Sequence, residues 1–325
     1  MHYELSIIGR LKRWTLPISM ISGALLYVIG HALPLSPLVK AETLHGIEFI
    51  QPILLFIMLF LAFSKVEPRQ MKPRRWHLWI ALIQSTLFAA TTFLLWLFPD
   101  TEARLALEGF MLAILCPTAT ACAVVTQKLG GDSAATTSYT IIINIIIAIL
   151  APLLLPIAHP QPGMTFIIAF LTIIYKVFPL LMVPLFLAWA VRYFLPSLHR
   201  LILHQRDAAF YMWAVALAFA ITVTCKALAH SNESLWHVGA IAFSTLIACI
   251  FQFAVGKWIG RHYGYRMEAG QAMGQKNTIF IIWLGYTFLS PISATAGGFY
   301  SIWHNVINSY QLYQHQKATN SVKDF

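Results

Sequence analysis

Five residues near the end of the chain, GQKNT at 274–278, place a lysine where hydrocarbon is expected. Lys276 is followed by TIFIIWLGYTFL, a run that is typical of a membrane-spanning helix. A charged lysine at the centre of a bilayer costs roughly 2.5 kcal/mol or more, so a lysine kept there indicates a function. The amides of Gln275 and Asn277 flank it, and Thr278 adds a hydroxyl. Such a group can bind an anion or replace a bound cation.

A second polar interruption occurs at 116–123, in CPTATACA. Pro117 removes a backbone donor and frees a carbonyl, which hydrocarbon tolerates only where the break lines a cavity or is buried in protein. The new helix ends expose N–H groups that bind anions and carbonyls that can coordinate cations. Thr118, Thr120 and Cys122 could therefore contact a substrate or an ion. The structural alternatives are a proline kink with small residues for close packing, and an inert, buried Cys122.

Composition places both runs in a membrane protein. Of the 325 residues 58% are hydrophobic and 10% are charged, whereas soluble proteins average about 25% charged residues. Windows of about 20 apolar residues predict ten spans joined by short connections, so no soluble domain is expected. The predicted spans are 15–33, 47–64, 77–98, 105–127, 134–158, 164–191, 208–229, 236–256, 268–289 and 294–313.

The basic residues indicate how these spans are oriented. Seventeen of the 22 Lys and Arg residues fall on the side of the N-terminus, and Lys40 and Arg104 fall on the opposite side. By the positive-inside rule both termini are expected in the cytoplasm of a bacterial-type inner (plasma) membrane. This asymmetry also accounts for the net charge of +10, so no nucleic acid is expected to bind. Three lysines remain within spans: Lys176, Lys226 and Lys276.

Ten spans divide into two sets of five, and an odd number per set turns the second set upside down relative to the first. The two interruptions then occupy the fourth and the ninth span, which are equivalent positions. Inverted repeats with matched broken helices are typical of transporters, whose substrate site lies at the repeat interface near the bilayer midplane. The sequence therefore predicts an all-α polytopic membrane protein of ten transmembrane helices in two inverted five-helix repeats, with helices four and nine broken.

Both motifs also resemble a known family. The run CPTATACAVVTQKLGGDSAATT is similar to the fourth-helix motif of the bile acid:sodium symporter family, and GQKNT with its flanks resembles the ninth-helix motif. The resemblance implies a single integral membrane unit, 1–325, with a panel part of about 1–76 and 160–232 and a core part of about 77–159 and 233–325. It also implies uptake of an organic anion coupled to two sodium ions near the crossing of the broken helices.

The sodium ligands that the resemblance implies are only partly present. The third-helix glutamine falls on Gln84, and fifth-helix hydroxyls fall on Thr136 and Thr140. The Ser-Asn pair after the fourth-helix break is replaced here by Cys122-Ala123, and the acidic residue of the ninth helix is replaced by Ala272. The family's glutamine is replaced by Lys276, so sodium coupling cannot be assumed from the resemblance.

The two other lysines within spans have plainer interpretations. Lys226 lies near the outer end of its span, so its ammonium group is expected to extend to the interface. Lys176 lies about 20 Å into the sixth span. It could face the cavity between the panel and core parts or pair with a carboxylate.

The function that these features favour is secondary active transport of an organic anion, such as a bile-acid-like compound, a small carboxylate or a sulfated compound. No Walker motif is present, so an ion gradient or the anion's own gradient must drive it. No cofactor or protein partner is implied beyond the anion and the lipid bilayer, and sodium or a proton could serve as the coupling ion. An enzyme is not expected. An arsenite-permease-type efflux carrier that uses Cys122 is the alternative within transport, and a channel or receptor is a further class.

A hypothesis for Lys276 follows from its surroundings in the sequence. Glu268 is the nearest acid on the same helix, and it lies about 12 Å away along the axis, too far for a direct pair. Lys276 is therefore expected to act as a resident cation in place of one sodium ion, stabilised by Gln84 and Asn277 and neutralised by the anion. Binding would be largely independent of sodium, and coupling to protons through the lysine becomes feasible. The alternative is that Lys276 pairs with a carboxylate from another span.

Overall fold

The computed structural model describes residues 7–34, 36–205 and 208–323, and within these ranges the chain is helical with no strand. Six of the described helices are long and apolar enough to cross a membrane: α2, α3, α6, α7, α9 and α10. The chain is therefore a multi-pass integral membrane protein. The helices are α1 (Ile7–Ala32), α2 (Pro37–Ser64), η1 (Pro68–Gln70), α3 (Arg75–Leu97), α4 (Arg104–Leu115), α5 (Cys122–Lys128), α6 (Ser133–Ala158), α7 (Phe166–Phe194), α8 (Pro196–His204), α9 (Ala208–Ala229), α10 (Leu235–His262), α11 (Arg266–Gly274), α12 (Thr278–Phe288) and α13 (Pro291–Lys323).

Each of the ten predicted spans overlaps one helix or a pair of consecutive helices. Several helices are longer than the apolar runs, because polar turns extend them. The early turns of α2 carry the polar residues Lys40, Glu42 and His45, and the helix begins at Pro37, where the side chain of Ser36 caps it. The sequence did not predict α8, a short helix between α7 and α9. One of its residues, His199, donates a hydrogen bond of 2.9 Å to the carbonyl of Ser64.

Both expected interruptions are present, between α4 and α5 and between α11 and α12. Pro117 has no N–H to donate and pushes the residue before it out of the helical conformation, so Cys116 is extended with ψ 135°. At the second interruption the side chain of Asn277 caps α12 by accepting a hydrogen bond of 3.3 Å from the backbone N–H of Phe280. Local sequence thus causes each break.

A seam of glycines joins α10 to α11. A Cβ atom at Gly256 would lie 2.5 Å from the carbonyl oxygen of Ala269, and one at Gly260 would lie 2.3 Å from that of Tyr265. Only glycine allows two helix backbones to approach this closely. The seam fixes α11, the first half of the second broken helix, against the long helix α10.

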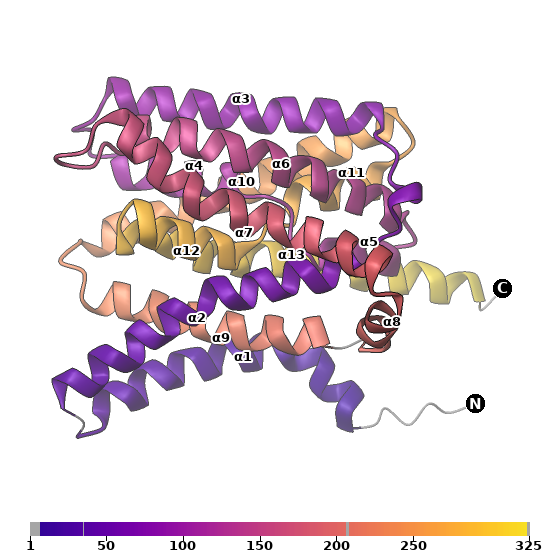
Figure 1. The fold of residues 1–325 in the computed structure, drawn as a ribbon, viewed down its shortest axis with the longest axis horizontal. Helices are drawn as coiled ribbons and strands as arrows, with labels where there is room; N and C mark the ends of the chain where they lie inside the picture. The colour runs from indigo at the N-terminus through magenta and orange to yellow at the C-terminus, as the bar shows by residue number, and fades with distance from the viewer. Residues whose placement is uncertain (1–6, 35, 206–207, 324–325) are drawn as a thin grey trace.

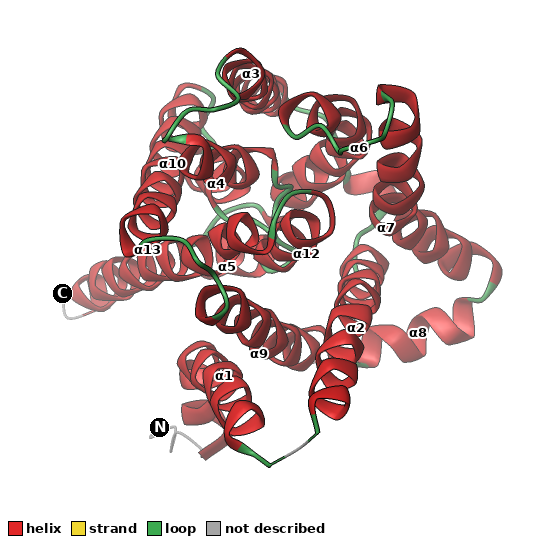
Figure 2. Ribbon diagram, turned by 90° about the vertical axis from the view of Figure 1, so that its left-hand side faces the viewer, coloured by secondary structure: helices red, strands yellow, loops and turns green. Residues whose placement is uncertain are grey.

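The helices gather in two groups (Figure 2). In the first group α9 packs on α1 and α2, and α7 packs on α2. The second group contains α3, α4, α6 and α10 to α13, with α4 and α13 packed on α10. The groups meet where α7 packs on α6 and where α2 and α9 pack on α12. In Figure 1, α1 begins and α13 ends on the same side of the bundle.

Candidate functional site

The two interruptions cross and bond to each other. Thr118 and Lys276 form an isolated antiparallel bridge. On either side of it, the N–H of Ala119 donates to the carbonyl of Gln275 at 2.8 Å, and the N–H of Asn277 donates to the carbonyl of Pro117 at 3.0 Å. Each break thereby supplies partners for backbone groups that the other leaves open, as a structure buried in a membrane requires.

Side chains satisfy further backbone groups at the crossing. The hydroxyl of Thr118 donates to the carbonyl of Ala272 at 2.6 Å, and the thiol of Cys116 donates to the carbonyl of Asn277 at 2.9 Å. The amide of Gln84 donates to the carbonyl of Cys116 at 3.0 Å. The crossing is therefore a rigid, bonded centre in which helices far apart in the sequence meet.

Lys276 lies at this centre and is 1% exposed. Its Nζ forms no hydrogen bond with any residue that the structure describes. The titratable groups that act on it are the thiols of Cys116, Cys122 and Cys249. Within the described ranges it has no ion pair, so the alternative of a carboxylate from another span finds no support. Glu268, as expected, does not reach it and instead accepts a hydrogen bond from the N–H of Asp132 at 2.7 Å.

The predicted stabilisation of Lys276 by Gln84 and Asn277 is wrong in this conformation. Gln84 donates to the backbone of the break, and its oxygen accepts a hydrogen bond from the hydroxyl of Tyr139 at 3.1 Å. The oxygen of Asn277 is engaged in capping α12. Both amides form hydrogen bonds with backbone groups that the breaks leave open. They stabilise the crossing and do not bind the ammonium group.

The remaining predicted site residues differ in how close they come to the crossing. Cys122 begins α5 and is fully buried, and Thr120 is half-buried within the first break. Gln275 and Thr278 flank the second break and are 4% and 5% exposed, and Oε1 of Gln275 has no described partner. Their side chains lie at the break but make no direct bond across it among the described hydrogen bonds.

Two residues expected as hydroxyl ligands are occupied by their own helix. The hydroxyl of Thr136 donates to the carbonyls of Asp132 and Ser133 at 3.0 and 3.1 Å, and that of Thr140 donates to the carbonyl of Thr136 at 3.0 Å. Among the described residues no group of three or more His, Cys, Asp and Glu side chains is placed to hold a metal ion.

Tyr300 and Gln252 also lie at the crossing, although the sequence did not predict them there. The hydroxyl of Tyr300 in α13 donates to the carbonyl of Gly274 at 2.8 Å. Gln252 in α10 donates to that hydroxyl at 3.0 Å and to the carbonyl of Ala113 at 3.2 Å. Gln252 is the one amide side chain in the largely apolar sequence of α10, and a polar residue within a span indicates a functional position.

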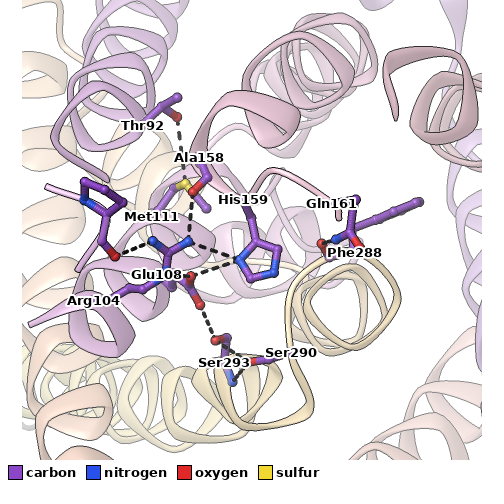
Figure 3. A network of polar contacts seen from close by, with 11 residues as sticks. Thr92, Arg104, Glu108, Met111, Ala158, His159, Gln161, Phe288, Ser290 and Ser293 are labelled. Atoms are coloured by element: carbon purple, nitrogen blue, oxygen red, sulfur yellow. Dashed lines mark hydrogen bonds and ion pairs between the residues drawn. The ribbon is translucent and has the colours of Figure 1, made fainter. Parts of the chain in front are cut away.

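Away from the crossing, Glu108 near the start of α4 ties three helices together (Figure 3). It is 1% exposed. Oε1 accepts hydrogen bonds from Arg104 at 3.0 Å and from His159, at the end of α6, at 3.1 Å. Oε2 accepts one from the hydroxyl of Ser293, in the first turn of α13, at 2.5 Å. The buried carboxylate is thus fully bonded.

Glu268 forms an equivalent arrangement in the second half of the chain. It lies near the start of α11, and its carboxylate binds the N–H of Asp132, the residue that caps α6. Arg74 pairs with Asp132 at 2.7 Å and stacks 4.3 Å above the ring of Tyr265. Glu108 in α4, before the first break, binds the start of α13, which follows the second break. Glu268 in α11, before the second break, binds the start of α6, which follows the first break.

Lys226, which is expected to extend to the interface, is partly exposed and forms an ion pair. Its Nζ lies 3.2 Å from Oε1 of Glu48 in α2 and 3.4 Å from the hydroxyl of Tyr286 in α12. Lys176 does not pair with a carboxylate among the described ion pairs. It is exposed at the meeting of the two helix groups, with Nζ 5.6 Å from the ring centroid of Phe288 in α12.

Comparison with known proteins places the chain in a family. The family model described as Sodium Bile acid symporter family matches residues 52–236, more than half of the chain, which includes the first break and ends before the second. A protein of Bacillus subtilis (strain 168) described as the uncharacterized sodium-dependent transporter YocS is 23% identical over 211 residues. That match spans 62% of this chain and 61% of the relative. On the extent of the family match, this chain belongs to the sodium bile acid symporter family.

Proposed function

We propose that the protein is a secondary transporter of an organic anion, with its binding site at the crossing of the two broken helices. Members of the family are transporters and not enzymes. One observation carries the choice of an anion: Lys276 is buried at the crossing with no described partner for Nζ. A buried ammonium group without compensation is costly, and an anion placed beside it offsets that cost.

The proposal includes an inverted repeat of ten spans. The two breaks occupy equivalent places in the halves, and the arrangement around Glu108 in one half is matched by that around Glu268 in the other. Reciprocal contacts of this kind are expected when two copies of one fold are related by a two-fold axis in the membrane plane. Both termini would then lie in the cytoplasm, in agreement with the distribution of basic residues.

Transport would proceed by alternating access, with a panel part of about 1–76 and 160–232 and a core part of about 77–159 and 233–325. The packing of α9 on α1 and α2, and of α7 on α2, supports this division. In the core, the glycine seam and the bonded crossing favour movement as one body. The panel would rock against it and expose the crossing to each side of the membrane in turn.

Sodium is not required in this proposal. The relative in Bacillus subtilis is described as sodium-dependent, but here Lys276 supplies a positive charge within the protein itself. Ala272 replaces the acidic residue of the resembling family's ninth helix, and it offers no side-chain oxygen as a ligand. A proton on the lysine would then be the coupling ion.

The first test is a thermal-shift screen of organic anions against the purified protein, with and without sodium. We expect bile acids, keto acids or sulfated compounds to raise the unfolding temperature, because a ligand that binds only the folded state stabilises it. The rise should be the same in sodium and in choline salts. The proposal is contradicted if every anion that raises the unfolding temperature does so only when sodium is present.

An arsenite carrier is the second candidate, and the buried thiol of Cys122, which begins the helix after the first break, is the observation that favours it. On the organic-anion proposal, Cys122→Ser should leave the arsenite resistance of cells that express the protein unchanged, because the thiol is a buried packing group. Resistance is measured as growth against arsenite concentration, with Cys225→Ser as the control. A resistance that disappears only in Cys122→Ser would favour the arsenite carrier.

A further inference from the structure

A row of polar side chains follows one face of α13. Tyr300, His304, Asn308 and Gln311 are spaced by four, four and three residues, which places them above one another on a helix. They are 0%, 5%, 4% and 9% exposed. The opposite face of the same helix is apolar or aromatic and exposed, as at Val306. The polar face is therefore turned into the protein, where the sequence of a membrane helix would ordinarily place apolar residues.

Three members of the row, Tyr300, Asn308 and Gln311, form hydrogen bonds with α11, the first half of the second broken helix. Nε2 of Gln271 donates to the side-chain oxygen of Asn308 at 3.0 Å and to that of Gln311 at 3.4 Å. At the other end of the row, the hydroxyl of Tyr300 donates to the carbonyl of Gly274, two residues before Lys276. The row thus runs alongside α11 as far as the crossing.

Most of these side chains keep an unsatisfied polar atom. Among the described residues, Nδ1 of His304, Nδ2 of Asn308, Nε2 of Gln311 and Oε1 of Gln271 have no hydrogen-bond partner. Buried polar groups in proteins are nearly always bonded to protein or to ordered water. Unpartnered donors and acceptors that lie along one seam are suited to binding a chain of water molecules.

This seam reaches Lys276. The thiols of Cys116 and Cys249 interact electrostatically with both the hydroxyl of Tyr300 and the ammonium group of Lys276. Cys122 is the third titratable group at Lys276, and no carboxylate or arginine acts on it among the described residues. Beyond Gln311, α13 continues through exposed residues such as Gln316 and Lys317 toward the side where α1 begins (Figure 1).

We propose that the seam between α13 and α11 is a hydrated pathway through which Lys276 exchanges its proton with the cytoplasmic side. Each water molecule passes one proton to the next, and the last O–H bond breaks as an N–H bond forms on Lys276. Overall, a hydronium ion and the neutral amine become water and the ammonium ion, and the reverse releases the proton. This rests on the proposed function, in which Lys276 is the coupling group, and it assigns the route that the proton takes.

The experiment uses the native thiol of Cys249 as the reporter at the inner end of the seam. Protein in lipid nanodiscs is exposed to silver ions, which bind thiols and can follow a path that admits water. The remaining free Cys249 is then measured by maleimide labelling after denaturation and mass spectrometry. We expect Asn308→Leu and His304→Phe each to slow the silver reaction of Cys249 about tenfold or more, because each removes a side chain that binds water in the seam.

Gln51→Leu is the matched control, because Gln51 is also a buried amide with an unpartnered atom but lies in α2. It should leave the rate at Cys249 unchanged, and Cys225, which is partly exposed in α9, should react equally fast in every variant and report on intact folding. The pathway is refuted if Cys249 reacts as fast in both seam variants as in the wild type, or does not react in the wild type. Since no transported anion is needed, this result is independent of the anion screen.

Discussion

Replacing Lys276 by glutamine should weaken anion binding about 10- to 100-fold, because a buried hydrogen bond between charged groups contributes about 1.5–3 kcal/mol. The same change should raise the unfolding temperature of the protein without ligand. An ammonium group that is 1% exposed and has no described partner destabilises the folded state, and glutamine removes its charge. These opposite effects distinguish a binding residue from a structural one, for which both would fall.

The measurement is anion affinity as a function of sodium concentration for the wild type and for Lys276→Gln. Lys317→Gln is the control, since it removes a lysine from an exposed stretch of α13. Wild-type affinity should be flat across the sodium series. If the wild type needs sodium and the glutamine variant binds equally well, Lys276 is not a resident cation.

The second large effect concerns the movement of the panel against the core. A Cβ atom at Gly298 in α13 would lie 3.6 Å from Cβ of Thr224 in α9. This separation fits a disulfide, which joins Cβ atoms about 3.8 Å apart. Oxidation of Thr224→Cys/Gly298→Cys should stop transport almost completely and leave anion binding largely intact, because the bond locks the two parts in one arrangement. Reduction should restore transport.

A matched pair within the core controls for the chemistry. A Cβ atom at Gly109 in α4 would also lie 3.6 Å from Cβ of Ala296 in α13. Oxidised Gly109→Cys/Ala296→Cys should transport at the normal rate, since both helices move together. The rocking mechanism is excluded if the oxidised panel–core pair still turns over as fast as its reduced form.

Much of the fold could be predicted from the sequence because the membrane constrains it strongly. An apolar run long enough to span must be helical, and polar residues with proline or glycine within such a run must mark a break. Both breaks and the overlap of every predicted span with helices followed from this. The additional helix α8 could not be predicted in this way, because a short amphipathic helix between spans contains no long apolar run.

The contacts at the site could be predicted less well, because they join residues distant in the chain. Lys226 and Glu48 are 178 positions apart, and nothing near either residue indicates the other. Gln84 and Asn277 were correctly expected at the crossing, but their amides had several candidate partners. Which partner each would take depends on how the breaks bond to one another. That is a property of the folded arrangement, and no local pattern encodes it.

The reciprocal carboxylates have a consequence for how the protein is made. Glu108 belongs to the half of the chain that is synthesised first, yet its hydroxyl partner Ser293 belongs to the half synthesised last. Glu268 in turn binds a backbone group at Asp132, which is already in the membrane when Glu268 is inserted. Until Ser293 is inserted, Glu108 has Arg104 and His159 of the early half as partners, but its Oε2 lacks the hydroxyl donor, and a buried acceptor without its hydrogen bond is unfavourable. The early half therefore stays incompletely hydrogen-bonded until the late half is inserted. Because the Glu108–Ser293 and Glu268–Asp132 contacts each join the two halves, the native fold is reached only when the halves assemble.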